Sequence, residues 1–251
     1  MDVSEAATFK SLSDQWWDRD GDFRALHALN SVRLELVNNL FKDESRKPWY
    51  PLYGMKIVDV GCGGGILSEP LARLGAKVLG IDLLPECIDA AKNHVASINP
   101  KQWEDAPFGA PEYRSISTQD LATEFPGKFD AVIASELLEH VSDWEKIVRD
   151  ASVCLKPGGH FIATTINRTM LSYWLGIVVA ENVLKIAPRG THTWDKFIEP
   201  SELCMAAVRH NLQPRKVIGI AYNPLSNSWR WSSSQSISYA FHAVKFSPEA
   251  P

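Results

Sequence analysis

The sequence predicts an α/β protein with a doubly wound, mostly parallel sheet and an antiparallel last strand. Three observations lead to this fold class. Short apolar runs that suit strands alternate with helical patterns through the middle of the chain. A glycine-rich loop directly follows the first of these runs. The last two strand patterns are joined without a helix, which is typical of an antiparallel pair.

The first 50 residues carry helical patterns, and we expect them to form an N-terminal extension (1–50) of a single domain (1–251). A first helix is predicted by the helical spacing of four large apolar residues, Phe9, Leu12, Trp16 and Trp17. A second helix is expected over Asn30–Leu40, because its apolar residues recur on one side.

Five crossover strands are expected in the middle of the chain. They are Lys56–Val60, Lys77–Asp82, Glu112–Ile116, Phe129–Ala134 and His160–Thr165. Helical patterns between them cover Leu67–Leu74, Leu84–His94 and Trp144–Val153. The stretch Ala96–Pro111 is expected to be a lengthened loop. Strands that alternate with helices in this way form a parallel sheet covered on both faces.

The end of the chain has a different pattern. A helix is expected from Pro200 to about His210, because proline suits the first helical position. Two strands follow, Arg215–Ala221 and Ile237–Lys245, with an aromatic loop between them. Together with the five crossover strands they make a seven-stranded, Rossmann-like sheet.

The composition is that of an ordinary soluble globular protein, with 45% hydrophobic and 22% charged residues. A net charge of −4 lacks the basic footprint of a nucleic-acid-binding protein, so no nucleic acid is expected as a partner. The first ten residues resemble neither a signal peptide nor an arginine-rich transit peptide. A reducing compartment is expected, because the cysteines show no zinc-site or disulfide spacing: Cys62, Cys87, Cys154 and Cys204.

The glycine loop fits D-x-G-x-G-x-G from Asp59 to Gly65. Gly61 and Gly63 allow a ligand to approach the backbone, and Asp82, which ends the next strand, can accept both hydroxyls of a ribose. A nicotinamide enzyme also has a glycine loop, and a tight turn is the simplest alternative. The preceding Asp59 and the G-x-G-x-G spacing favour S-adenosylmethionine over a dinucleotide.

A second polar group follows the fourth strand, where Ser135 precedes Glu136, Glu139 and His140. If this segment is helical, the last three side chains face one way. Two carboxylates and an imidazole suit a divalent cation, and the oxygens favour Mg²⁺. The alternative is a polar pair formed by Glu139 and His140, with His140 as a general base.

A mostly apolar run, Met170–Ile186, is too short for the roughly 20 apolar residues that span a bilayer. We expect a helical lid or membrane-contacting insertion over 168–195, which suits a substrate with a long apolar tail. A buried helix or a dimer contact is the alternative. His192 either reaches the pocket or has a structural role.

Several stretches together resemble the ubiquinone-biosynthesis O-methyltransferase family, and the tail of the chain resembles its mitochondrial branch. The stretches are W-W-D at 16–18, L-H-x-x-N-x-x-R at 26–33, DVGCGGGILSEPLARLGA at 59–76, SELLEHV at 135–141, TTINRT at 164–169 and GTHTWDKFI at 190–198. They cover nearly the whole chain, and the last two are more diagnostic than the glycine loop.

The resemblance implies roles for individual residues. Arg33 would pair with the carboxylate of S-adenosylmethionine, although composition alone favours a solvated helix charge at this position. The glycine loop and Asp82 would hold the donor beside Ser135. Glu136, Glu139 and His140 would bind Mg²⁺ or another divalent cation. Glu136 and His140 would also act in catalysis.

The resemblance also implies a substrate and a location. The substrates would be polyprenylated catechols of ubiquinone biosynthesis, 3,4-dihydroxy-5-polyprenylbenzoate and demethylubiquinol. The protein would lie on the matrix side of the mitochondrial inner membrane as a peripheral protein, with a biosynthetic complex as a partner. The alternatives are a methyltransferase for another catechol, a nicotinamide oxidoreductase and a catalytically silent lipid-binding subunit. Intact Gly61, Asp82 and Glu136 argue against a silent subunit.

Overall fold

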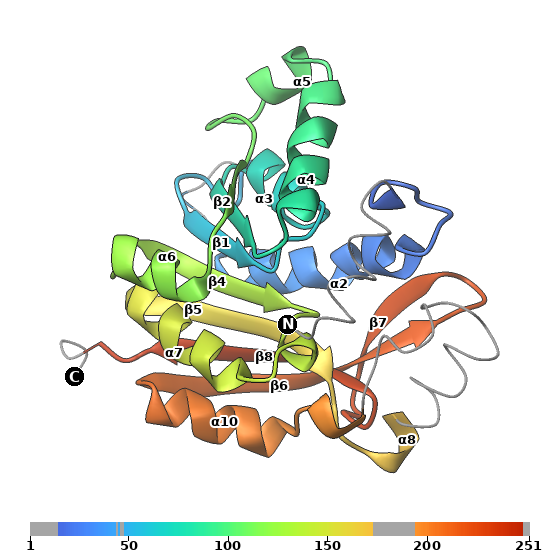
Figure 1. Ribbon diagram of the computed structural model, residues 1–251, viewed down its shortest axis with the longest axis vertical. Coiled ribbons are helices and arrows are strands. Elements are labelled where there is room, and N and C mark those ends of the chain that lie inside the picture. Colours follow the sequence, from blue (N-terminus) through green and yellow to red (C-terminus); the bar gives the residue numbers. More distant parts are fainter. Residues whose placement is uncertain (1–14, 44, 46–47, 173–193, 248–251) are drawn as a thin grey trace.

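The computed structural model describes residues 15–43, 45, 48–172 and 194–247. It shows an eight-stranded sheet with helices on both faces (Figure 1), in the order β3-β2-β1-β4-β5-β8-β6-β7. The strands are β1 (Lys56–Val60), β2 (Lys77–Asp82), β3 (Glu112–Ser115), β4 (Phe129–Ser135), β5 (Leu155–Ile166), β6 (Leu212–Asn223), β7 (Ser228–Ser232) and β8 (Ser238–Lys245).

The first five strands are parallel, and the last three are antiparallel to their neighbours. The expected α/β fold with an antiparallel last strand is therefore confirmed. The sheet has one strand more than the seven expected, because β7 forms a hairpin with β6 inside the segment expected to be a loop. Its register pairs Tyr222 with Trp229 and Ile220 with Trp231.

Helices cover both faces of the sheet. The longer ones are α2 (Arg24–Leu40), α3 (Ser68–Arg73), α4 (Pro85–Ser97), α6 (Thr118–Glu124), α7 (Trp144–Cys154) and α10 (Pro200–Arg209). The short ones are α5 (Lys101–Glu104), α8 (Met170–Ser172) and the 3-10 turns η2 (Leu138–His140) and η4 (Trp194–Lys196). Residues of α2 and α3 form one apolar layer with the sheet, and residues of α6, α7 and α10 form the other.

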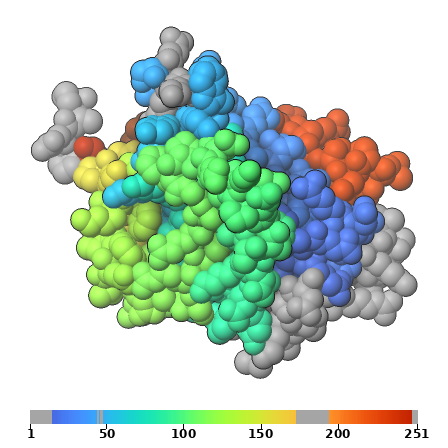
Figure 2. Space-filling model, turned by 90° about the horizontal axis from the view of Figure 1, so that it is seen from above, coloured from blue at the N-terminus to red at the C-terminus, as the bar shows by residue number. Residues whose placement is uncertain are grey.

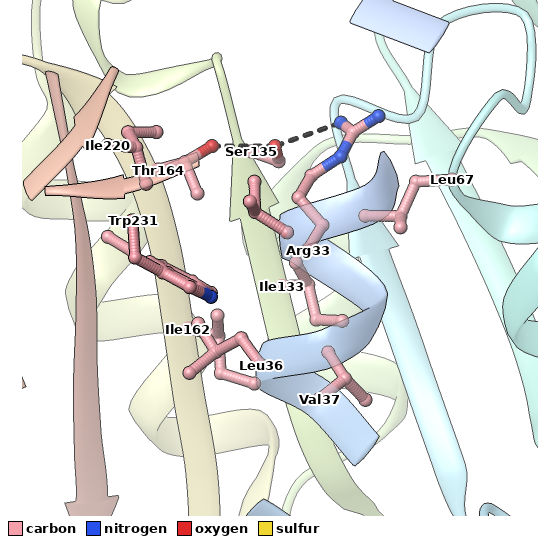
Figure 3. A pocket seen from close by; sticks show the side chains of 12 residues that line it. Arg33, Leu36, Val37, Leu67, Ile133, Ser135, Ile162, Thr164, Ile220 and Trp231 are labelled. Carbon is pink, nitrogen blue, oxygen red and sulfur yellow. Dashed lines mark hydrogen bonds between the residues drawn. The ribbon is translucent and has the colours of Figure 1, made fainter. Parts of the chain in front are cut away.

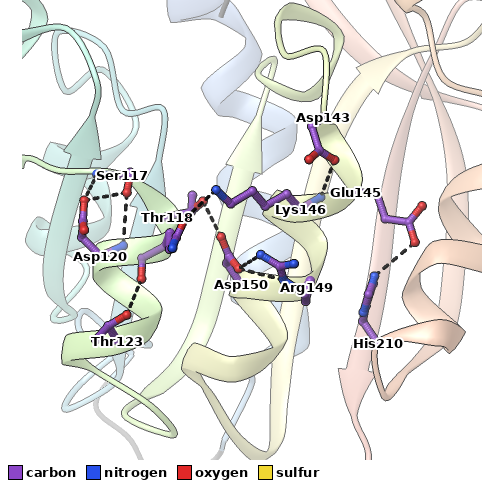
Figure 4. A network of polar contacts seen from close by, with 11 residues as sticks. Ser117, Thr118, Asp120, Thr123, Asp143, Glu145, Lys146, Arg149, Asp150 and His210 are labelled. Carbon is purple, nitrogen blue, oxygen red and sulfur yellow. Dashed lines mark hydrogen bonds and ion pairs between the residues drawn. The ribbon is translucent and has the colours of Figure 1, made fainter.

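Three helices differ from the expectation. α2 begins at Arg24 rather than at Asn30, and α5 lies inside the stretch expected to be a loop. α6 was not expected, because seven residues give little periodicity. A capping box between Ser117 and Asp120 starts it, and Thr118 Oγ1 donates a 2.8 Å hydrogen bond to Asp150 Oδ2 of α7 (Figure 4).

The first helix expected from the sequence is only partly within the described residues. Trp16 and Trp17 lie in a turn, while Phe9 and Leu12 lie outside the described part of the chain. Most of the expected lid, including His192, also lies outside it. Across 15–43, 45, 48–172 and 194–247, no helix has the length and apolar character needed to cross a bilayer.

The hairpin of β6 and β7 packs against α2. Figure 2 shows the N-terminal part of the chain, in blue, beside this hairpin, in orange. Trp229 Nε1 donates a 2.8 Å hydrogen bond to the carbonyl of Ala25, and Trp231 Nε1 donates one of 2.9 Å to Glu35 Oε2. The antiparallel end of the sheet thereby fixes the position of α2.

We predict that Trp229→Phe lowers the free energy of unfolding by about 1 kcal/mol, because it keeps an aromatic ring but removes the hydrogen bond to the Ala25 carbonyl. Urea unfolding measures the change. Trp49→Phe, at a position that is 65% exposed, is the control and should change stability by less than about 0.5 kcal/mol. Equal effects of the two substitutions would show that the hairpin does not brace α2.

Candidate active site

The glycine loop leaves β1 in a conformation that requires glycine. Gly61 and Gly63 have positive φ angles of 69° and 52°. A Cβ at Gly61 would lie 2.6 Å from Leu137 Cδ1, and one at Gly63 would overlap the ring of Trp16. Just before the loop, the buried carboxyl of Asp59 accepts a 2.7 Å hydrogen bond from Ser68 Oγ. Burial raises the pKa of Asp59 to about 6.

Asp82 is fixed beside this loop at the end of β2. Its Oδ2 accepts a 3.1 Å hydrogen bond from the Gly63 amide, and its Oδ1 accepts one of 2.9 Å from the Leu84 amide. Burial raises the pKa of Asp82. Each carboxylate oxygen has a second lone pair, so the side chain can still accept hydrogen bonds from the two hydroxyls of a ribose.

Arg33 carries its charge into the protein rather than into solvent. The side chain projects from α2 and is 5% exposed, so the reading as a solvated helix charge is wrong. Its Nη1 donates a 3.0 Å hydrogen bond to Ser135 Oγ, and its Nη2 donates one of 2.9 Å to the Leu26 carbonyl. Burial lowers the pKa of Arg33 to about 10, which leaves it charged at neutral pH.

Arg33 has no carboxylate in direct contact among the described residues, although the charges of Asp59 and Glu136 favour its charged form. Within the described part of the chain no carboxylate forms an ion pair with it, and Nε is buried without a hydrogen-bond partner. A buried cation is costly unless it is paired. The arrangement therefore suits a ligand that brings its own carboxylate.

A narrow cavity lies beside Arg33, between α2 and the sheet (Figure 3). Its volume of about 10 Å³ gives room for about one water molecule. The polar part of its lining is Arg33, Ser135 and Thr164, and the rest is apolar: Val32, Leu36, Val37, Leu67, Ile133, Ile162, Ile220, Trp231 and Ala240. This cavity is too small for a prenyl chain.

Glu136 has a strained backbone. Its φ angle is 52°, which is unusual for a residue with a side chain and is found often at functional sites. Its amide donates a 2.9 Å hydrogen bond to the Thr164 carbonyl, which holds this conformation. Within the described residues, its carboxylate oxygen Oε1 is buried and has no hydrogen-bond partner. This oxygen of Glu136 can therefore accept a hydrogen bond from a ligand.

Glu139 and His140 do not share a helix face with Glu136. The expected helix is absent, because the left-handed residue Glu136 is followed by the 3-10 turn η2. The Glu139 side chain is buried, and its Oε2 accepts a 2.8 Å hydrogen bond from Thr165 Oγ1. In the described part of the chain, no three His, Cys, Asp or Glu side chains come together as a metal site. The three side chains as they stand do not form a cation site.

The structure adds residues that sequence reasoning did not assign to the site. Trp17 Nε1 donates a 2.9 Å hydrogen bond to the Gly64 carbonyl, and the Trp16 ring lies against Gly63 and Gly64. Asn30 Nδ2 donates a 2.8 Å hydrogen bond to the Ile66 carbonyl. For the two tryptophans the sequence signal was the W-W-D stretch, which contributed to the family resemblance and to a predicted helix but was given no role in the site.

The sequence of the chain is similar to those of known methyltransferases. Residues 25–217 match the model of a methyltransferase domain family. A ubiquinone biosynthesis O-methyltransferase of Albidiferax ferrireducens is 41% identical over 97% of this chain and 90% of its own length. The human mitochondrial ubiquinone biosynthesis O-methyltransferase is 44% identical over 98% of this chain.

The chain belongs to the ubiquinone biosynthesis O-methyltransferase family. The resemblance drawn from the sequence motifs is thereby confirmed. The chain spans 65% of the length of the human member and 66% of the length of the bovine one. A methyltransferase from Thermotoga maritima, described as S-adenosylmethionine-dependent and as a possible histamine N-methyltransferase, has the same fold. It is 16% identical, with a TM-score of 0.64 over 96% of this chain and 99% of its own.

For this family member we predict a pH dependence of stability from Asp59. Because burial raises its pKa, the folded chain holds a proton that the unfolded chain releases between about pH 4 and pH 6. The stability from this group is full at low pH and is lost as the pH rises through 6. From pH 4 to pH 7, Asp59→Asn should therefore gain about 2 kcal/mol relative to the parent. Urea unfolding across this range measures it, and parallel curves would contradict the prediction.

Proposed function

We propose that this chain transfers the methyl group of S-adenosylmethionine to a hydroxyl of a polyprenylated catechol in ubiquinone biosynthesis. The names of the relatives support this reaction. The observation that carries it is the buried Arg33, which forms no ion pair with a described carboxylate and has a free Nε, near the glycine loop and Asp82. The proposed acceptors are 3,4-dihydroxy-5-polyprenylbenzoate and demethylubiquinol.

The donor supplies a methyl group already activated on a sulfonium, so the chain has to bind and orient the two reactants. Arg33 pairs with the donor carboxylate through Nε and Nη1. Asp82 accepts the ribose hydroxyls, and the glycines allow the backbone to approach the donor. Arg33 and Asp82 come from α2 and β2, and each is fixed by hydrogen bonds to residues outside its own element. This fixation sets the direction of the methyl group.

The acceptor hydroxyl has to lose a proton to become a good nucleophile. Glu136 is placed for this role, because its Oε1 is buried without a hydrogen-bond partner in the described part of the chain. His140, buried at the end of η2, is the other candidate for the base.

A divalent cation such as Mg²⁺ is a narrower proposal. Glu136 would be its first ligand, and Glu139 and His140 would have to turn toward it, because the three side chains are not grouped as a metal site. A bound cation would favour loss of the proton from the catechol hydroxyl.

The location and partners are proposals that rest on the relatives. The animal relatives carry the word mitochondrial in their names, and bacterial relatives also exist. We propose that this chain lies at the matrix side of the mitochondrial inner membrane, in peripheral contact with lipid and within a biosynthetic complex. A polyprenylated substrate dissolves in the bilayer, so an enzyme that acts on it has to work at the membrane surface.

We predict that Arg33→Met weakens binding of S-adenosylhomocysteine at least tenfold and leaves binding of 5′-methylthioadenosine, which has no carboxylate, unchanged. The free energy of unfolding of the free chain should not fall, because the variant removes a buried, unpaired charge. Asp82→Ala is the matched variant and should weaken both nucleosides by about 1–3 kcal/mol. Calorimetric titration measures all four affinities.

Equal losses for both nucleosides in Arg33→Met would contradict the carboxylate role. A parent chain that binds neither nucleoside would contradict the methyltransferase, and binding of a nicotinamide dinucleotide instead would indicate an oxidoreductase. Donor binding without turnover of any catechol would indicate a silent subunit.

The metal proposal predicts that a chelator abolishes methylation of the catechol and that Mg²⁺ restores it. Glu136→Ala should then lose turnover while it still binds S-adenosylhomocysteine. A methylation assay on the parent chain, with and without chelator, measures the first effect. Full activity in chelator would rule out the metal and leave Glu136 or His140 as a simple base.

A further inference from the structure

Two adjacent threonines at the end of β5 carry buried hydroxyls on opposite faces of the sheet. Thr164 and Thr165 are 3% and 0% exposed. Successive side chains of a strand point to opposite faces, so the two hydroxyls reach different surroundings. Valine would fill the same space and is fully apolar, so each buried hydroxyl is a cost that its hydrogen bonds have to offset.

Thr164 reaches the donor side of the site. Its register partner in β4 is Ser135, and the two hydroxyl oxygens are 2.7 Å apart. Ser135 Oγ already accepts a hydrogen bond from Arg33, so its own hydrogen is available to Thr164 Oγ1. Figure 3 shows Arg33, Ser135 and Thr164 as neighbours along one wall of the cavity. Thr164 therefore holds the hydroxyl that orients the guanidinium.

Thr165 reaches Glu139, in the segment that follows β4, on the other face of the sheet. Its Oγ1 donates a 2.8 Å hydrogen bond to Glu139 Oε2, and both residues are buried. The backbone between the two hydroxyls also takes part, because the Thr164 carbonyl accepts the amide of Glu136. The dipeptide thus bonds to three residues of the segment after β4: Ser135, Glu136 and Glu139.

We propose that Thr164 and Thr165 are positioning residues with separate tasks: Thr164 orients Arg33 through Ser135 for the donor, and Thr165 fixes the Glu136–His140 segment for the acceptor. This inference rests on the proposed function. The two residues share one strand and one peptide bond, yet their hydroxyls serve different substrates. Neither threonine has to touch a reactant for this to hold.

The test compares Thr164→Val with Thr165→Val in two assays, calorimetric titration with S-adenosylhomocysteine and steady-state methylation of a soluble short-chain catechol. Thr164→Val should weaken S-adenosylhomocysteine about tenfold and raise the donor KM, with kcat within twofold of the parent. Thr165→Val should leave the donor affinity within twofold and lower kcat at least tenfold. A loss of folding alone would lower the fraction of active protein in both assays. It would not give one variant a defect in donor affinity and the other a defect in kcat.

Thr164→Ser and Thr165→Ser are the matched controls, because they keep the hydroxyl and remove only the methyl group. Both should behave as the parent does in both assays. The inference is overturned if each valine variant loses donor affinity and kcat to the same extent. It is also overturned if a serine variant is as impaired as the valine variant at the same position. If the valine variants do not fold, parent-like serine variants support the role of the hydroxyl and impaired ones overturn it. Failure of the parent to bind S-adenosylhomocysteine would instead overturn the proposed function.

Discussion

Arg33 holds a positive charge between α2 and the sheet, and the oxygens that accept its hydrogen bonds, from Leu26, Asn30 and Ser135, are neutral. Burial of an unpaired guanidinium costs stability, so the surrounding structure has to hold it in place. Asn30, one turn before Arg33, donates a hydrogen bond to the carbonyl of Ile66 just after the glycine loop. At the end of β4, Ser135 Oγ accepts a hydrogen bond from Arg33 Nη1. At the other side of α2, the β7 tryptophans bond to Ala25 and Glu35. The glycine loop and the antiparallel hairpin thus both bond to α2, the helix that carries Arg33.

The sheet brings the remaining groups together by its topology. The parallel strands β1, β2, β4 and β5 end at one edge, so the loops that follow them meet there. The glycine loop, Asp82 and the segment after Ser135 come from three of these ends, and the two threonines come from the fourth. The strained backbone at Glu136 fits this arrangement, because a sharp turn directly after β4 lets Ser135 face α2 while Glu139 reaches the opposite side.

Much of this could be predicted from the sequence, because alternating strand and helix patterns and a glycine loop have strong local signals. The crossover strands, Asp82 beside the loop and Arg33 on a helix were all predicted. The direction of Glu139 was not, because helical spacing assumes an α-helix and nothing in the letters SELLEH marks a left-handed residue at Glu136. β7 was missed because five residues rich in serine and tryptophan read as a loop, and their pairing depends on β6. Hydrogen bonds between distant segments, such as Trp17 to Gly64, have no local signal at all.

If Arg33 pairs with the methyl donor, the donor carboxylate completes its buried charge. A crystal structure of the chain with S-adenosylhomocysteine would reveal this pairing. We expect the ligand carboxylate within hydrogen-bond distance of Arg33 Nε or Nη1, the ribose hydroxyls on Asp82, and the bond from Arg33 to Ser135 retained. A ligand whose carboxylate lies in solvent or on another cation, while Arg33 keeps its present contacts, would show that Arg33 does not bind the donor.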